Sequence, residues 1–305
     1  MGNPYDGIIL IDKEEGKTSF DVVKGVRRLL KVKKVGHAGT LDPFATGLLI
    51  ILLGQGTKLS NYLMAGDKAY QATMRLGVET DTQDLTGRVV GRKLVPEFEP
   101  ESIRKVAQRF VGEIDQIPPL FSAVNYRGKR AYELAREGIK MDLQKRRVKV
   151  HSLEITSVDL PDVTMRVTCS RGTYVRSLAA DLGKEMGPGA HLKCLRRLRS
   201  GPFRVEDALN LETLAHLSRI RLVQQIGIPL HKALPDMKEA RVEGGMAQRI
   251  RNGHQPGCDE VAMADFPRFF EGYTKLVDRE GLVAIAKVHP ESENKASLKI
   301  MRVFN

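Results

Sequence analysis

The sequence predicts an α+β protein built from two domains. Segments with strand and helix patterns alternate along the chain without the regular βαβ repeat of a doubly wound parallel sheet. The 305 residues exceed a typical domain of about 100–200 residues, and a hydrophobic content of 42% allows a sizeable core. The pattern changes near Pro235, so we expect one domain over residues 1–235 and a second over residues 236–305.

The first elements are a strand, a capped helix and a second strand. Residues 7–11 form an apolar run typical of a buried strand. Thr18 is expected to cap the next helix, because Asp21 stands in the position that a capping box requires. The apolar positions of this helix recur at helical spacing: Phe20, Val23, Val26, Leu29 and Leu30. A glycine-rich loop then leads into the apolar strand 48–53.

The rest of the first domain mixes both element types. After a short helix near 58–64, an alternating strand carries Tyr70, Ala72, Met74 and Leu76 on one face. The further predictions are an amphipathic helix over about 103–111 after the cap-like Pro100-Glu101-Ser102, an exposed basic excursion over about 118–150 with a short helix near 129–138, strands at 148–158 and 163–169, a turn at 170–172 and a helix over 173–186.

The last 70 residues or so have a different pattern. Short β-like pieces at 276–277, 282–288 and 298–303 are separated by glycine, proline and charged turns, and residues 250–253 are typical of a helix end or a turn. We therefore expect a small β domain at this end of the chain.

The charge favours a polyanionic partner. The formal net charge is +12 and the pI is about 9.6, so nucleic acid is the first candidate and an acidic membrane surface the second. Residues 127–150 contain nine basic and three acidic residues, and residues 193–204 contain five basic residues and no acid. A solvated charged face is the alternative, but such a face usually mixes both signs. The candidate RNA contacts are Arg127, Lys129, Arg130, Arg136, Lys145, Arg146, Arg147, Lys193, Arg196 and Arg197.

Other features exclude several classes of protein. Cys169, Cys194 and Cys258 form no CxxC pair, which argues against a disulfide framework or a zinc site and favours a reduced cytoplasm. No apolar run reaches the 18 or so residues of a membrane span. Gly16-Lys17-Thr18 lacks the preceding glycine of a phosphate-binding P-loop, since Ile11 stands there. We expect neither a metal, nor a membrane association, nor a bound nucleoside triphosphate.

The most informative stretch is the loop over residues 36–47, which carries three glycines and one carboxylate, Asp42. Glycine lets backbone approach a ligand closely, and Pro43 fixes the backbone after the carboxylate. A second glycine turn at Ser170-Arg171-Gly172 precedes a helix whose Arg176 has apolar neighbours. A buried guanidinium needs a carboxylate partner, and Asp42 is the natural candidate.

Other polar residues have ordinary structural explanations. Glu79, Asp81 and Asp84 could form a metal site, but their threonine and glycine neighbours favour a turn closed by side-chain hydrogen bonds. His37 could contact a substrate or brace its loop. Tyr70, Tyr174 and Leu195 are core residues unless other information assigns them a role.

Four motifs together resemble the TruB family of tRNA pseudouridine-55 synthases. They are GHAGTLDPFATG at 36–47, GDKAY at 66–70, SRGTYVR at 170–176 and GAHLKCLRR at 189–197, in the family's order and spacing. The resemblance implies a pseudouridine-synthase core with a mixed, largely antiparallel sheet and flanking helices. It also implies a thumb-like insertion at about 118–150 and a PUA-like RNA-binding domain over 236–305. One departure is Glu14, where the family usually has proline after Lys13.

The resemblance also implies roles for individual residues. Asp42 matches the catalytic aspartate, assigned here as the nucleophile, although the residues equally allow a base that starts a glycal route. Arg176 matches its ion-pair partner, and Tyr70 matches the aromatic residue that stacks on the flipped uracil. His37, Tyr174 and Leu195 match positions that line the nucleotide pocket. The reaction needs no cofactor, because no atom enters or leaves the RNA.

The implied activity is isomerisation of uridine 55 in the T-loop of tRNA, with the base flipped out of its stack. We expect a stand-alone enzyme that needs neither a guide RNA nor an obligate protein partner. The alternatives are a non-catalytic RNA-binding or RNA-folding protein, a guide-RNA-dependent synthase, and a glycoside hydrolase. A hydrolase usually needs two carboxylates that flank one site, and the sequence offers no clear second one.

Overall fold

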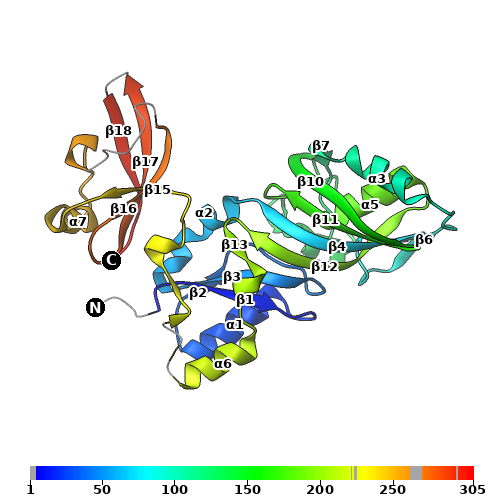
Figure 1. Ribbon diagram of the computed structural model, residues 1–305, viewed down its shortest axis with the longest axis horizontal. Helices are drawn as coiled ribbons and strands as arrows, with labels where there is room; N and C mark the ends of the chain where they lie inside the picture. The colour runs from blue at the N-terminus through cyan, green and yellow to red at the C-terminus, as the bar shows by residue number, and fades with distance from the viewer. Residues whose placement is uncertain (1–4, 221, 223–224, 262–269, 293–294) are drawn as a thin grey trace.

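A large mixed sheet forms the centre of the molecule (Figure 1). The computed structural model describes residues 5–220, 222, 225–261, 270–292 and 295–305. The described strands of this sheet pair antiparallel except for β3 with β12, as the sequence led us to expect. In spatial order they are β14 (Ile228–Pro229), β1 (Gly7–Lys13), β3 (Thr46–Leu53), β12 (Ala190–Ser200), β4 (Lys68–Leu76), β11 (Asp162–Cys169), β10 (Arg146–Asp159) and β7 (Gly112–Gln116), with β2 (Val35–His37) beside β3 and β13 (Phe203–Arg204) beside β12.

Helices flank the sheet. They are α1 (Ser19–Leu30), η1 (Gly54–Leu59), α2 (Ser60–Ala65), α3 (Pro100–Gln108), α5 (Val175–Met186), η2 (Val205–Asp207), α6 (Leu211–Arg219) and η4 (Leu230–Lys232). Those up to α5 lie near predicted positions, whereas η2, α6 and η4 were not predicted. The capping box predicted at Thr18 and Asp21 is present at the start of α1. The prediction that Phe20 belongs to the buried stripe is wrong, because Val22, Val23, Val26 and Leu30 form that stripe and Phe20 is 56% exposed.

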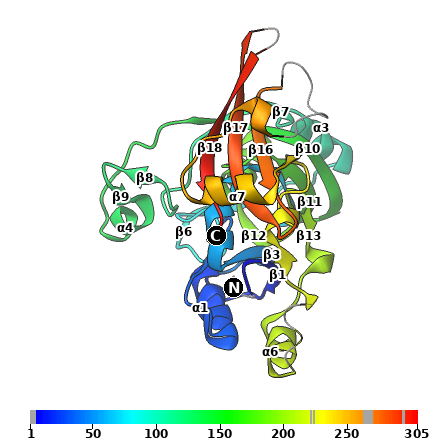
Figure 2. The ribbon, with the colours of Figure 1, turned by 90° about the vertical axis from the view of Figure 1, so that its left-hand side faces the viewer.

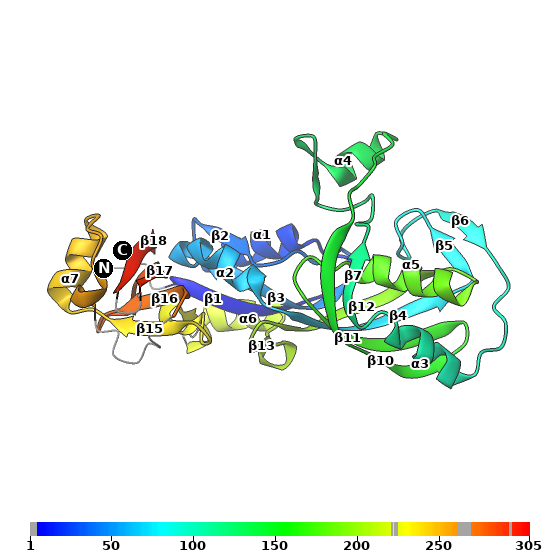
Figure 3. The ribbon, with the colours of Figure 1, turned by 90° about the horizontal axis from the view of Figure 1, so that it is seen from above.

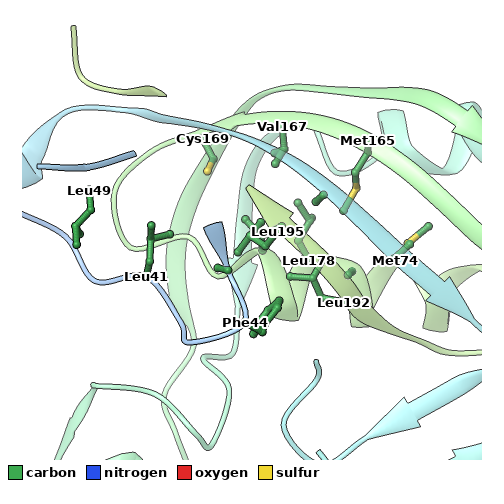
Figure 4. Close-up of a cluster of buried hydrophobic side chains, with 14 of the residues drawn as sticks. Leu41, Phe44, Leu49, Met74, Met165, Val167, Cys169, Leu178, Leu192 and Leu195 are labelled. Atoms are coloured by element: carbon green, nitrogen blue, oxygen red, sulfur yellow. The ribbon is translucent and has the colours of Figure 1, made fainter. Parts of the chain in front are cut away.

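The sheet has a hydrophobic cluster on each face. The larger cluster joins α1 and α5 to the sheet and includes Leu41 and Phe44 of the glycine-rich loop, together with Leu195. Figure 4 shows these side chains gathered with Leu178 and Cys169. The alternating strand behaves as predicted, because Ala72, Met74 and Leu76 are buried on one face of β4. The glycine-rich loop is therefore part of the core and not a free surface loop.

The basic excursion leaves the sheet between β7 and β10. Those two strands pair antiparallel and close its base, while β8 (Asn125–Tyr126), β9 (Lys129–Arg130) and α4 (Ala131–Arg136) project away from the sheet (Figures 2 and 3). A small cluster of Val124, Ala131 and Leu143 holds the excursion together. A second ribbon, β5 (Val78–Thr80) with β6 (Val89–Arg92), lies at the far end of the sheet.

A four-stranded sheet forms the C-terminal part. Its strands are β15 (Lys238–Arg241), β16 (Gly272–Val277), β17 (Leu282–Ser292) and β18 (Lys295–Val303), accompanied by α7 (Gly244–Arg251) and η5 (Cys258–Glu260). The expected small β domain is thus present, and it has its own core. It also packs on the large sheet, because Ile285 and Phe304 belong to the same hydrophobic cluster as Ile8 and Leu63.

Candidate active site

The loop that carries Asp42 is fixed from several sides. The Ser19 hydroxyl donates to the Leu41 carbonyl at 3.1 Å and accepts from the Leu41 amide at 2.9 Å. On the other side of Asp42, the buried Lys13 ammonium donates to the Pro43 carbonyl at 3.1 Å. Burial lowers the pKa of Lys13 to about 8. Glu14 stands where the resembled family usually has proline, and the hydrogen bond from Lys13 to the Pro43 carbonyl is present all the same.

One glycine of the loop is required by a close backbone approach. Gly47 has φ +99°, and a Cβ at this position would lie 2.3 Å from the carbonyl oxygen of Arg197. Only glycine fits where β3 runs beside β12 in this conformation. The loop is thereby tied to the centre of the sheet.

Asp42 forms the ion pair that the sequence suggested. Its Oδ2 lies 3.0 Å from Nε of Arg176, and its Oδ1 accepts a hydrogen bond of 3.2 Å from Nη2. The Arg176 side chain is 5% exposed, whereas that of Asp42 is 33% exposed. The carboxylate is therefore held from the protein side and remains open to a ligand on the other.

A second carboxylate holds Arg176 from behind, and the sequence reasoning missed it. Oδ2 of Asp84 lies 3.3 Å from Nη1 of Arg176, and its side chain is also 5% exposed. Oδ1 of Asp84 closes its own turn by accepting from the Thr82 hydroxyl and from the Thr86 amide and hydroxyl. The turn interpretation was therefore correct for one oxygen, while the other oxygen fixes the guanidinium.

Arg176 also joins the excursion to the site. Its Nη2 donates to the carbonyl of Phe121 at 3.0 Å, and its Nη1 donates to the carbonyl of Thr82 at 3.1 Å. One buried side chain thus connects the Asp42 loop, the turn at Asp84 and the start of the excursion.

The electrostatics of Asp42 are a balance between burial and charge. Burial raises the pKa of Asp42 above its ordinary value, and the nearby Asp84 carboxylate raises it further. The guanidinium of Arg176 and the ammonium of Lys13 oppose this increase in pKa. A buried carboxyl group whose pKa is shifted beside a specific charged partner is typical of a functional site.

Tyr70 is near enough to Asp42 for the carboxylate charge to act on its phenol, and Arg197 contacts the loop that carries Asp42. The two residues are cross-strand partners in β4 and β12. Tyr70 is half-buried, and its hydroxyl is hydrogen-bonded to the Arg197 guanidinium. Burial raises the pKa of the Tyr70 phenol, so it stays neutral.

The expectation that Arg197 contacts RNA is wrong. Arg197 is 1% exposed and donates to the carbonyls of Leu48, Gly39 and Thr40. Side chains alternate between the two faces of a strand, and the loop that carries Asp42 covers the face of β12 on which Arg197 lies. Arg197 braces the Asp42 loop from below.

His37, Tyr174 and Leu195 differ in their surroundings. His37 lies on β2, and its buried Nδ1 has no hydrogen-bond partner within the described chain. Burial and the Arg197 charge lower its pKa, so the ring is neutral. Tyr174 caps α5 and packs against the small cluster of the excursion. Leu195 is 8% exposed within the main core, which fits its structural explanation.

Comparison with known proteins assigns the chain to a family. The family model "TruB family pseudouridylate synthase (N terminal domain)" matches residues 27–175, and "tRNA pseudouridylate synthase B C-terminal domain" matches residues 176–235. A tRNA pseudouridine synthase B of Geobacter sulfurreducens is 42% identical over 98% of this chain and 100% of its own. The protein of that name from Moorella thermoacetica is 41% identical over 98% and 99%. The chain belongs to the TruB family of pseudouridine synthases.

Solved structures agree with this assignment. A structure titled "Crystal Structure of a Cbf5-Nop10-Gar1 Complex" matches with a TM-score of 0.78 and 27% identity, over 99% of this chain and 86% of that one. A second, titled "Structure of H/ACA RNP bound to a substrate RNA containing 2'-deoxyuridine", matches with a TM-score of 0.75 and 25% identity over the same shares. As a TruB-family pseudouridine synthase, the protein is an enzyme of the isomerase class.

The basic residues of this TruB-family chain fall into two groups. Seven on the excursion and at the start of β10 are exposed: Arg127, Lys129, Arg130, Arg136, Lys145, Arg146 and Arg147. A cavity of about 410 Å³ in the excursion is lined by Tyr126, Arg127 and Arg146, among others. By contrast, Lys193 pairs with Asp162 at 2.6 Å and Arg196 with Asp12 at 2.7 Å, so both are already neutralised. Of the seven exposed cations, Arg147 lies near Glu113 at 3.8 Å and Asp115 at 3.7 Å. The excursion therefore carries most of the candidate cations that have no acidic partner among the described residues.

Within the part of the chain that the structure describes, no group of three or more His, Cys, Asp or Glu side chains could hold a metal ion. Glu79, Asp81 and Asp84 accordingly do not converge, and Asp81 closes its turn by accepting from the Arg88 amide at 2.9 Å. None of the described helices has the length and apolar character needed to span a bilayer.

Proposed function

We propose that the protein isomerises uridine 55 in the T-loop of tRNA to pseudouridine, with Asp42 as its essential carboxylate. The observation that carries the proposal is a single carboxylate, open on one side, at the end of a buried chain of ion pairs through Arg176 to Asp84. The relatives named tRNA pseudouridine synthase B support tRNA as the substrate.

The reaction explains why a lone carboxylate is sufficient. The N-glycosidic bond of the uridine breaks, the uracil turns, and its C5 joins the same sugar carbon, so no atom is gained or lost. Asp42 acts either as the nucleophile that attacks the sugar or base, or as the base that starts a glycal route. Arg176 keeps the carboxylate ionised and directs both of its oxygens. This reaction requires no cofactor and no metal.

The uracil must leave its stack before it can turn. Flipping costs a few kcal/mol of lost stacking. We assign Tyr70 to stack on the extruded base, which returns about 1–3 kcal/mol. His37, Tyr174 and Leu195 would line the nucleotide pocket, and apolar walls there exclude water that could intercept the detached sugar.

The RNA is held by separate parts of the chain. We assign residues 1–235 as the catalytic domain, the excursion at about 118–150 as a thumb that grips the T-arm, and residues 236–305 as a PUA-like RNA-binding domain. The exposed cations of the excursion support the thumb assignment, and Arg176 ties its base to Asp42 through the Phe121 carbonyl. Because the chain itself supplies these RNA-binding surfaces, we propose that it works without a guide RNA.

The test uses the purified chain and one unmodified tRNA transcript in EDTA, followed by mapping of modified uridines. We expect pseudouridine at position 55 without any added RNA, protein or metal. Absence of pseudouridine, or its appearance only with a guide RNA, would overturn the proposal. Binding without modification would instead favour the non-catalytic RNA-binding alternative.

A further inference from the structure

A cavity lies at the seam between the large sheet and the C-terminal domain, away from Asp42. It has a volume of about 570 Å³, within the range of small-molecule sites. Its walls come from α2, the turn after β12, the segment 233–237, and strands β16 and β18. Since the two domains share a hydrophobic cluster, these walls are held in a fixed relation.

The cavity has one aromatic wall. Tyr62 of α2 and Tyr273 of β16 meet edge to face, with ring centroids 5.2 Å apart. Tyr62 is half-buried and Tyr273 is 42% exposed, so the pair stands at the opening instead of in a core. Aromatic faces at a cavity opening suit a planar ring, because base–aromatic stacking is favourable for every base.

The charge of the cavity is positive. Arg171, Lys58 and Arg302 contribute cations, against the single carboxylate of Asp236. Neither Arg171 nor Arg302 pairs with an acid among the residues that the structure describes, and both are exposed. Lys58 is more constrained, because its ammonium donates to the Val303 carbonyl at 2.6 Å and to Oε1 of Gln55 at 2.8 Å. Two guanidinium groups without an acidic partner in the described chain thus line the cavity together with the two tyrosines, and that of Arg302 also donates to the Met301 carbonyl at 3.2 Å.

We propose that this cavity is a binding site for a nucleoside monophosphate unit. The base would stack on the Tyr62–Tyr273 wall, and the phosphate would lie against Arg302 and Arg171. Guanidinium groups favour phosphate because their donors match its oxygens. The unit is supplied either by a free nucleotide or by an unpaired nucleotide of an RNA chain.

The site is distinct from the proposed catalytic one. Burial and the neighbouring Tyr273 raise the pKa of Tyr62, so its phenol stays neutral and does not repel an anion. AMP is the primary probe, because its base differs from the uracil that the Asp42 site is proposed to hold. Uridine and inorganic phosphate test the two halves of the ligand separately.

Binding is measured by calorimetry on the full chain, and by tyrosine fluorescence, since the chain contains no tryptophan. We expect AMP to bind at millimolar or lower concentration. Tyr62→Leu and Arg302→Gln should each weaken it about tenfold or more, as expected from loss of a stacking ring or a charged contact. Arg166→Gln, an exposed arginine outside the cavity, is the matched control and should bind AMP like the parent.

Several outcomes would overturn the site. They are the absence of AMP binding, equal affinity for AMP and inorganic phosphate, or unchanged AMP affinity in both variants when their melting temperatures match the parent. A short single-stranded oligonucleotide of RNA separates the two sources: it displaces AMP if RNA supplies the unit, and does not if a free nucleotide does. Asp42→Asn should still bind AMP, so failure of the proposed tRNA activity leaves this test independent.

Discussion

Replacement of Asp84 by asparagine tests whether a second carboxylate fixes the site. Asp84 uses Oδ1 for the Thr82 and Thr86 bonds and Oδ2 for Arg176. The amide of asparagine offers only one acceptor oxygen. If that oxygen serves the turn, the NH₂ group faces the guanidinium, donor against donor; if it serves Arg176, the turn loses its bonds.

The expected loss of stability follows from the hydrogen bonds that Asp84→Asn would remove. A hydrogen bond to a charged group contributes about 1.5–3 kcal/mol, so Asp84→Asn should lower the free energy of unfolding by about 2–3 kcal/mol. At about 2–4 °C per kcal/mol, the melting temperature should fall by about 4–12 °C. The rate of pseudouridine formation should fall about 10–100-fold, because Asp42 loses its fixed direction.

The assay combines thermal melting with single-turnover rates on a tRNA transcript. Asp81→Asn is the control in the same turn, since asparagine retains the bond to the Arg88 amide and the ion pair it loses involves a 94% exposed arginine. A surface pair of this kind contributes about 0–1 kcal/mol. If Asp84→Asn melts and reacts like Asp81→Asn, the positioning role of Asp84 is refuted.

Three further predictions concern charge. The acid limit of activity should lie above the ordinary aspartate range near about 4, because the ionised form is required and the fold raises the pKa of Asp42; removal of the Asp84 charge should move that limit to lower pH. A limit at or below the ordinary value would contradict this. A raised pKa in the folded state means that the ionised form of Asp42 lowers the free energy of unfolding at neutral pH. Asp42→Asn should therefore melt no lower than the parent at pH 7, and any gain in melting temperature should vanish as the pH falls below the pKa of the unfolded chain. A large fall in melting temperature at pH 7 would show that the ion pair with Arg176 outweighs the cost of burial. The affinity for tRNA should fall less steeply with salt in Arg127→Gln and in Arg136→Gln: the magnitude of the slope of log affinity against log salt should be smaller by about 0.7–0.9 in each variant. Unchanged slopes would show that neither residue contacts the RNA.

The local features of the fold could be predicted from the sequence because they depend on neighbouring residues. The capping box at Thr18 and the one-sided burial of β4 follow from spacing alone. The Asp42–Arg176 pair could be predicted from the sequence for a different reason. A buried arginine must find an acid, and the loop offered a single carboxylate.

The misses share a physical cause, which is contact between residues far apart in the chain. Asp84 meets Arg176 across 92 residues, so its local turn pattern showed only half of its bonding. A charge count treats every cation as exposed, yet Arg197 is buried beneath a loop that lies about 150 residues earlier in the chain and whose carbonyls accept its hydrogen bonds. Phe20 satisfied the helical spacing but lies beside the buried stripe, where Lys24 covers its ring at 4.6 Å.

The most direct measurement of the central claim is single-turnover pseudouridine formation by Asp42→Asn with tRNA binding measured in the same preparation. We predict that turnover is abolished while tRNA affinity stays within a few-fold of the parent, because the charge acts in bond making and the excursion supplies the grip. Residual turnover near the parent rate, or a collapse of affinity together with activity, would contradict the role assigned to this carboxylate.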